Sequence, residues 1–227
     1  AGLPTIDRQT GTVLRALTNC GLFRLGGTLV GTQAFRHYDA VLGVDLSKIL
    51  PDVSSLAQTE DLDIAAFERL SLTLEDQAEP DLNETLAGFG FKARPSLKDT
   101  RPTSWLLPDA SFAVDFLTPA FSDDTSPVHL KSLNVWAQPL HYLNFLIADP
   151  VPAVSLYIEG MLVQIPAPER YAVHKLIVAQ LRHQGSAKAA KDIAQARVLI
   201  AALSASRPQE FFTVLEEASS KGPKWKA

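Results

Sequence analysis

The spacing of apolar residues along the first half of the chain switches between helical and strand-like intervals. Leucines and valines at helical intervals predict a helix over residues 8–22, with Gly21 near its end. The glycine-rich stretch that follows predicts a turn, a short strand over 28–30 and a second helix that reaches about Leu42. Later apolar runs predict strands over 61–65, 91–97, 103–109 and 111–119, and a hairpin over 153–166 with its turn at Glu159-Gly160.

The pattern becomes helical throughout after Pro166. Three further helices are expected, and Ser186 suits the N-cap of the second one. Strands and helices do not alternate strictly before this point, so the chain is predicted to be α+β rather than a doubly wound sheet. We therefore expect a core over residues 1–165 and a C-terminal helical region over 166–227. The expected helices span 167–182, 186–205 and 207–220.

Composition and charge narrow the classes of protein to consider. The 227 residues are 46% hydrophobic and 20% charged, which is ordinary for a globular chain with a real core. The net charge of -4 gives no broad attraction to nucleic acid. A single cysteine, Cys20, excludes an internal disulfide and suggests a reducing compartment, so a cytoplasmic location is expected.

Neither a membrane span nor a signal peptide is visible in the sequence, so no membrane partner is expected. The first residue is Ala rather than Met, which suggests that the sequence is a piece of a longer chain.

Two aspartates in the segment "TEDLDIA" are the first candidates for chemistry. Residues two apart on a strand share a face, so Asp61 and Asp63 should stand side by side while Leu62 and Ile64 enter the core. Adjacent carboxylates repel each other unless a cation lies between them, and Mg²⁺ prefers such hard oxygen ligands. Chance alone supplies about one Asp-x-Asp in a chain of this composition, so the motif by itself is a weak signal and the alternative is an acidic turn before a core strand.

A third aspartate strengthens the metal hypothesis. Asp115 lies in the middle of the apolar strand "FAVDFL", where a carboxylate is costly unless it is paired or metal-bound. The alternative is an aspartate in a salt bridge near the edge of a sheet.

The segment "LVGTQAF" offers a phosphate-binding turn. A strand ends at Gly31-Thr32 and a helix begins there, so backbone N–H groups are free to meet phosphate oxygens. The alternative is a tight strand-to-helix turn in which Thr32 is simply the N-cap.

Together these elements resemble the DNA polymerase β-like nucleotidyltransferase superfamily, whose members pair a Gly-Gly or Gly-Ser turn with a later Asp-x-Asp strand and a third carboxylate on another strand. Thr32 departs from the Gly or Ser that is usual at its position in the superfamily. Longer blocks are similar to a bacterial family of nucleotidyltransferase-fold proteins. These blocks are "LFRLGGTLVGTQAF", "TEDLDIA", "VDFLTP", "AQPLHYLNFLI", "PAPERYAVHKLIVAQLR" and "AKAAKDIAQARVLI".

The resemblance implies a metal-dependent enzyme that moves a nucleoside monophosphate from an NTP such as ATP to an acceptor hydroxyl and releases pyrophosphate. It implies a mixed-sheet core with flanking helices. The metal, Mg²⁺ with Mn²⁺ as an alternative, would be held by the three aspartates. The roles implied are metal ligands for Asp61 and Asp63, a metal ligand and general base for Asp115, and phosphate binding for Gly31 and Thr32.

Lysines of the C-terminal helices are the candidates for neutralising phosphate charge. Lys175 lies in a block that resembles the family, so we expect it to bind the triphosphate, with Lys191 as a second candidate. For Lys188 we expect a solvent-exposed helix pair with Asp192. His174, next to Lys175, is expected to be a packed or capping residue.

Two other functions stay open. The fold can hold a nucleotide or a protein partner without catalysis, as an antitoxin-like or regulatory module, or the acidic residues can be structural. The acceptor can be a tRNA end, a protein or a small molecule, and the sequence does not fix the oligomeric state.

Overall fold

The computed structural model describes residues 6–73, 75–94, 99–109, 112–183, 185–222 and 225. Its strands are β1 Thr28–Leu29, β2 Asp61–Ala65, β3 Lys92–Ala93, β4 Ser104–Leu107, β5 Phe112–Pro119, β6 Val128–Leu130, β7 Val135–Leu140, β8 Pro150–Tyr157 and β9 Glu159–Pro166. Its helices are α1 Arg8–Asn19, α2 Gly31–Phe35, α3 Tyr38–Leu42, α4 Val53–Leu56, α5 Glu68–Thr73, α6 Leu82–Gly88, α7 Leu143–Leu146, α8 Pro168–Leu181, α9 Ala187–Ser206 and α10 Pro208–Ser220, with a short 3-10 helix at Leu46–Lys48.

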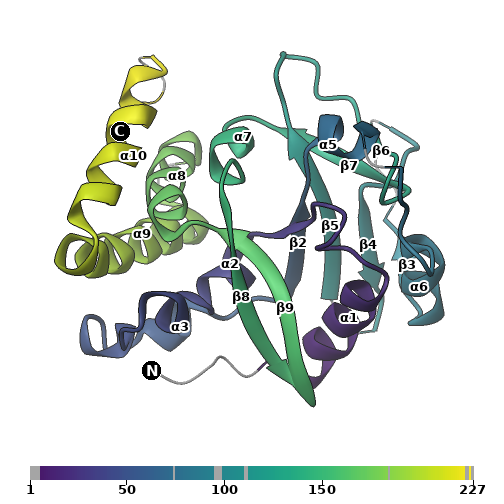
Figure 1. Cartoon of the computed structure of the whole chain (residues 1–227), viewed down its shortest axis with the longest axis horizontal. Coiled ribbons are helices and arrows are strands. Elements are labelled where there is room, and N and C mark those ends of the chain that lie inside the picture. Colours follow the sequence, from purple (N-terminus) through teal and green to yellow (C-terminus); the bar gives the residue numbers. More distant parts are fainter. Residues whose placement is uncertain are drawn as a thin grey trace.

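The central sheet is mixed, and β5 is its organising strand. β5 pairs in parallel with β2 on one side and antiparallel with β4 on the other, in the order β1-β2-β5-β4-β3. Leu117 of β5 pairs with both Ala65 and Gln138, so β7 lies on the side of β4 and continues the sheet past the end of that strand. Figure 1 shows β2, β5 and β4 side by side in the middle of the molecule. The predicted α+β class is confirmed.

A second sheet consists of the hairpin β8–β9 alone. Its register pairs Tyr157 with Glu159, so Ile158 forms the turn with a left-handed φ of 60°. The predicted turn at Glu159-Gly160 is therefore wrong by one residue. The hairpin is tied to the segment between α2 and α3 through a buried contact between His37 Nε2 and Ser155 Oγ.

Two other predictions from the sequence need correction. The helix expected to run to Leu42 is broken into α2 and α3, with Arg36 and His37 between them. The strand expected over 91–97 is confined to β3, and residues 95–97 lie outside the described residues. β6 and β7 were not predicted: β6 has only three residues, and Pro139 near the end of β7 argues against a strand.

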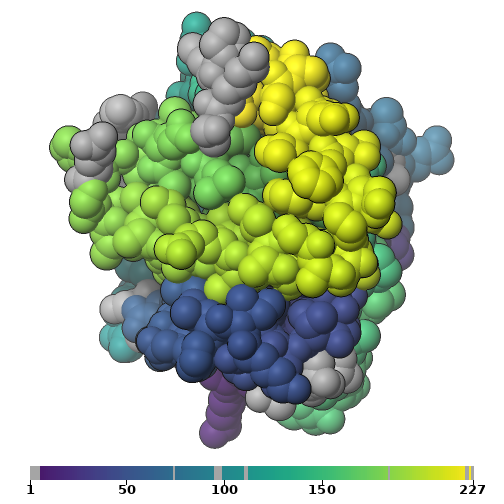
Figure 2. Space-filling model, turned by 90° about the vertical axis from the view of Figure 1, so that its left-hand side faces the viewer, coloured from purple at the N-terminus to yellow at the C-terminus, as the bar shows by residue number. Residues whose placement is uncertain are grey.

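The three C-terminal helices form where the sequence predicts them. α8 packs against both α9 and α10, on one side of the sheet (Figure 1). α9 lies across the earlier segment that carries the 3-10 helix and α4, as the space-filling view shows (Figure 2). Of the helices described, none pairs the length of a membrane span with the apolar composition it needs. The division into regions 1–165 and 166–227 stays a prediction.

Candidate functional site

Three aspartates share one face of the central sheet. In the parallel register of β2 and β5, Asp63 lies opposite Asp115 and Asp61 lies opposite Ala113. Partners in such a register project from the same face, and side chains two apart on a strand do so as well. Leu62 and Ile64 project from the other face and are buried, as predicted, with 0% and 1% of their surface exposed. The packed core therefore fixes the direction in which the carboxylates point.

The three carboxylates repel one another. Burial raises the pKa of Asp63 to about 6, and the charges of Asp115 and Asp61 act in the same direction. Burial also raises the pKa of Asp115, with Asp61 adding to the effect, although its cross-strand neighbour Ser104 and Arg94 oppose it. This face accumulates negative charge that a cation would relieve.

Gly31 brings the backbone of the β1–α2 turn against Asp63. The N–H of Val30 donates to the carbonyl oxygen of Asp63 at 2.9 Å. Gly31 has a φ of 63°, and a Cβ built on it would lie 2.1 Å from Oδ2 of Asp63. Only glycine fits this left-handed, crowded position without strain.

Thr32 is the second residue of α2, and Val30 is the N-cap. The reading of Thr32 as a capping residue is therefore wrong. Its side chain is partly exposed in the first turn, next to Gly31.

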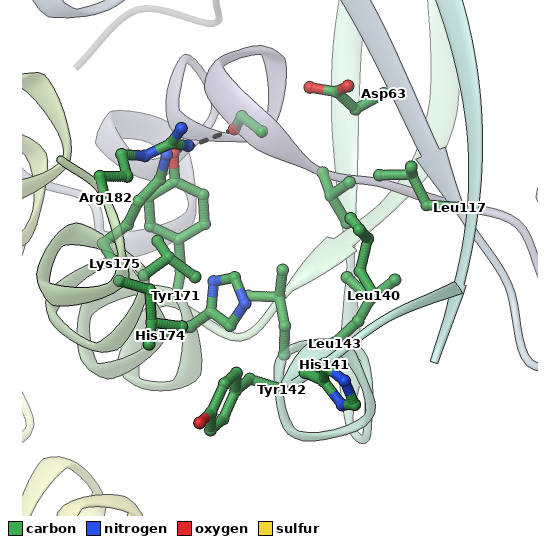
Figure 3. Close-up of a pocket in the computed structure, with 15 residues that line it drawn as sticks. Asp63, Leu117, Leu140, His141, Tyr142, Leu143, Tyr171, His174, Lys175 and Arg182 are labelled. Carbon is green, nitrogen blue, oxygen red and sulfur yellow. Dashed lines mark hydrogen bonds between the residues drawn. The ribbon is translucent and has the colours of Figure 1, made fainter. Parts of the chain in front are cut away.

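A cleft of about 550 Å³ opens beside Gly31 and Asp63. Figure 3 shows Asp63 and Leu117 on one side of it, with Tyr171, His174, Lys175 and Arg182 opposite. Polar groups gather at the end near Gly31, whereas the other end is largely apolar. Leu140, His141, Tyr142 and Leu143 lie at that end, and Leu117, Leu146, Val178 and Leu181 add further apolar side chains to the lining.

The cleft brings together three of the predicted residues, Gly31, Asp63 and Lys175. Asp61 and Asp115 share the acidic face with Asp63 but do not line the cleft, and neither does Thr32. His174 does line it. Burial lowers the pKa of His174 to about 3, so its imidazole is neutral at physiological pH.

The polar groups of α8 that face the cleft are held by α9 and by Gly31. The hydroxyl of Tyr171 lies 3.0 Å from the carbonyl oxygen of Gly31. Nζ of Lys175 donates to Oδ1 of Asp192 at 2.5 Å, and Nε of Arg182 donates to Oδ2 at 2.7 Å. Asp192 is only 3% exposed and Lys175 is 8% exposed, so this ion pair is buried, whereas Arg182 is exposed at the edge of the cluster.

This cluster changes two predictions. The expected pair between Lys188 and Asp192 is wrong, since Asp192 already accepts from Lys175 and Arg182. Lys175 lies in the cleft as expected, but its ammonium pairs with the carboxylate of Asp192. Its role as a phosphate-binding residue stays a prediction. Sequence reasoning missed Asp192 as its partner. The signal was present, because Asp192 lies in one of the blocks that resemble the family.

Metal binding can be tested against these residues. In the described part of the chain, no group of three or more His, Cys, Asp or Glu side chains has the arrangement of a metal site. Mg²⁺ rarely needs one, because it is commonly bound by one or two carboxylates together with substrate phosphates and water. The carboxylates of Asp61, Asp63 and Asp115 supply the hard, negatively charged oxygens that such an ion requires. Their mutual repulsion would be relieved by a bound cation. The residues present therefore fit Mg²⁺.

This chain is similar to two solved structures and to a family model. A crystal structure of an antigenic nucleotidyltransferase-like protein from Paracoccidioides brasiliensis is 18% identical, with 98% of this chain and 92% of that one covered and a TM-score of 0.43. The solution structure of the antibiotic-resistance factor ANT(2'')-Ia is 13% identical, with 96% and 100% covered and a TM-score of 0.41. The search of curated proteins gave no match. A family model described as nucleotidyltransferase matches residues 8–220, which include every candidate residue described above. The chain therefore belongs to the nucleotidyltransferase family.

Proposed function

We propose that this chain is a metal-dependent enzyme of the polymerase β-like superfamily, of bacterial origin, that moves a nucleoside monophosphate from an NTP to an acceptor hydroxyl. One observation carries the proposal: Asp61, Asp63 and Asp115 share a face of the sheet, and Gly31 lies against Asp63. A purely structural set of aspartates would be paired with cations. Here the carboxylates repel one another instead.

Each residue of the site would have a separate role in nucleotidyl transfer. Asp61 and Asp63 would hold Mg²⁺ against the triphosphate, and Asp115 would complete the metal site. When bound, the ion would offset charge on the phosphates and on the attacking and leaving oxygens. Gly31 lets the carboxylate of Asp63 lie against the turn. The backbone N–H groups at the start of α2 would meet phosphate oxygens, and Thr32 would add a hydroxyl.

Asp115 would also act as the general base. Its raised pKa favours proton uptake from the acceptor hydroxyl. The hydroxyl oxygen then bonds to the α-phosphorus, the bond from that phosphorus to the bridging oxygen breaks, and pyrophosphate leaves. Positioning and electrostatic stabilisation supply most of the catalysis in reactions of this kind.

The apolar end of the cleft suits the uncharged part of a substrate. Its leucines and Tyr142 offer a surface for a planar or apolar group, while the phosphates lie toward Gly31.

Addition of NTP and Mg²⁺ should raise the melting temperature of the wild-type protein. A ligand bound only by the native state stabilises it by about 2.7 kcal/mol at a hundred times its Kd. For a chain of this size that is about 5–10 °C. Differential scanning fluorimetry with each of the four NTPs is the measurement.

The same shift should shrink below about pH 6, because Asp63 then holds a proton that the metal must displace. NTP without divalent metal is the control and should give a smaller shift. No shift with any NTP at millimolar concentration with Mg²⁺ would contradict the proposal.

Substitution Gly31→Ala should weaken both the fold and the site. The new Cβ would meet Oδ2 of Asp63, and the left-handed φ of 63° adds about 1–2 kcal/mol of strain. We expect a lower melting temperature and a loss of the NTP-dependent shift.

Gly43→Ala is the matched control for this substitution. Gly43 has a similar φ of 65°, but nothing lies within 4 Å of an added Cβ. It should lose stability from strain alone and keep the NTP-dependent shift. Equal loss of that shift in both variants would show that the contact between Gly31 and Asp63 is unimportant.

A further inference from the structure

The proposed substrate needs a cation that the cleft itself does not provide. A triphosphate approaches a face that already bears three carboxylates, so a free lysine or arginine beside it would aid binding. Lys175 and Arg182 line the cleft, but both of them are engaged with the two carboxylate oxygens of Asp192. The cation has to come from elsewhere.

One face of α9 follows the chain that leads into β2. Nε2 of Gln195 donates to the carbonyl oxygen of Leu56 at 2.7 Å. One turn earlier on the helix, Nζ of Lys191 donates to the carbonyl oxygen of Gln58. One turn closer to the start of α9, the contact therefore lies two residues further along the segment that leads into β2. The contacts thus approach Asp61. Figure 2 shows α9 lying over the segment that carries the 3-10 helix and α4, which leads into β2.

Lys188 is the next residue on that face. It lies three residues before Lys191 and seven before Gln195, which places it on the same side of the helix. It is exposed, and among the described residues it forms no ion pair. The contacts of Gln195 with Leu56 and of Lys191 with Gln58 advance two residues in one turn of α9, so the position of Lys188 one turn earlier corresponds to the residues next to Asp61. Arg94 is a second cation near this face, because its backbone N–H donates to the carbonyl oxygen of Ser104, which pairs with Asp115.

We infer that Lys188, rather than Lys175 or the backbone-bound Lys191, binds the phosphates of the incoming nucleoside triphosphate. This inference rests on the proposed function. In it, Lys175 holds α8 to α9 through Asp192, and the exposed Lys188, which pairs with no carboxylate among the described residues, would reach from α9 to the acidic face. The contact would be to the triphosphate and not to the base, because a lysine ammonium acts as a point charge.

The test is binding of triphosphate compared with monophosphate in the presence of Mg²⁺. Calorimetric titration would use the α,β-methylene analogues of the four NTPs, which cannot react, and the matching nucleoside monophosphates. Lys188→Gln should weaken binding of the analogue about tenfold or more, as expected for loss of a hydrogen bond to a charged group. Monophosphate binding should change less than about twofold, and Lys188→Arg should restore most of the affinity.

Arg197→Gln is the matched control, because Arg197 is exposed on the same helix nine residues away, on the opposite face. It should leave binding unchanged. Wild-type affinity in Lys188→Gln, or a tenfold loss in Arg94→Gln without one in Lys188→Gln, would overturn the inference and leave the proposed function standing. Absence of binding in the wild type would overturn both.

Discussion

Replacing Asp63 with asparagine should abolish nucleotidyl transfer and at the same time stabilise the metal-free protein. The carboxylate is a proposed metal ligand, so its loss should lower the rate by about 10²–10³-fold, the scale seen when a group that stabilises transition-state charge is removed. The same carboxylate is destabilising without metal, because burial and two neighbouring aspartates disfavour its charge. The asparagine keeps the shape and removes that charge.

The size and pH dependence of the stabilisation follow from the pKa. Asp63 has a pKa of about 6 in the folded protein and an ordinary value of 3.8 when exposed. The native state therefore holds its proton more tightly, and the wild type loses stability as the pH rises from about 4 to above 6. The difference corresponds to about 3 kcal/mol at most. Asp63→Asn should therefore exceed the wild type in stability at pH 7, and this advantage should be smaller at pH 4.

Urea unfolding at both pH values, with a chelator present, measures this advantage. Asp109→Asn is a suitable control, because Asp109 is an exposed carboxylate outside the acidic face, in the turn before β5. Its variant should show little difference from the wild type. If the Asp63→Asn variant is less stable than the wild type at pH 7, the charge of Asp63 does not destabilise the metal-free protein.

Replacing Asp192 with alanine should have the largest effect on stability. Asp192 accepts from Lys175 and Arg182, and Lys175 is itself only 8% exposed. Removal of the carboxylate leaves a buried ammonium without a partner, which costs about 3–5 kcal/mol. For a chain of this length the melting temperature should fall by roughly 6–20 °C.

A double variant separates an unpaired charge from loss of packing. Lys175→Met with Asp192→Leu removes the pair and fills its space, and such replacements of buried ion pairs are often neutral or stabilising. Thermal melts should therefore place the double variant well above Asp192→Ala. A single variant that melts within about 1 °C of the wild type would show that the ion pair does not hold α8 to α9.

The sequence was sufficient for those parts of the site that depend on local pattern. The apolar run around Asp115 predicted β5, and the alternation around Leu62 and Ile64 predicted which face of β2 is buried. The C-terminal helices were predicted by their periodicity and caps. These features depend on residues close together in the chain, so their signals are readable without a structure.

Long-range pairing was not readable in the same way. Nothing in either strand alone shows that β2 and β5 are parallel with Asp63 opposite Asp115, and a shift by one residue would send the carboxylates to different faces. The partner of Lys175 was also missed, because Asp192 is seventeen residues away on another helix. The break between α2 and α3 lies where His37 contacts Ser155, a residue on the distant hairpin.

Transfer of label from an NTP labelled at the α-phosphate tests the central claim most directly. The wild type would be incubated with each NTP, Mg²⁺ and cell extract, and both the labelled acceptor and released pyrophosphate would be followed. We predict labelling with at least one NTP, in step with pyrophosphate release, and only background labelling with Asp63→Asn or Asp115→Asn. NTP binding by the wild type without pyrophosphate release would indicate a non-catalytic binding module. Labelling by both variants at the wild-type rate would contradict the assignment of these aspartates to catalysis.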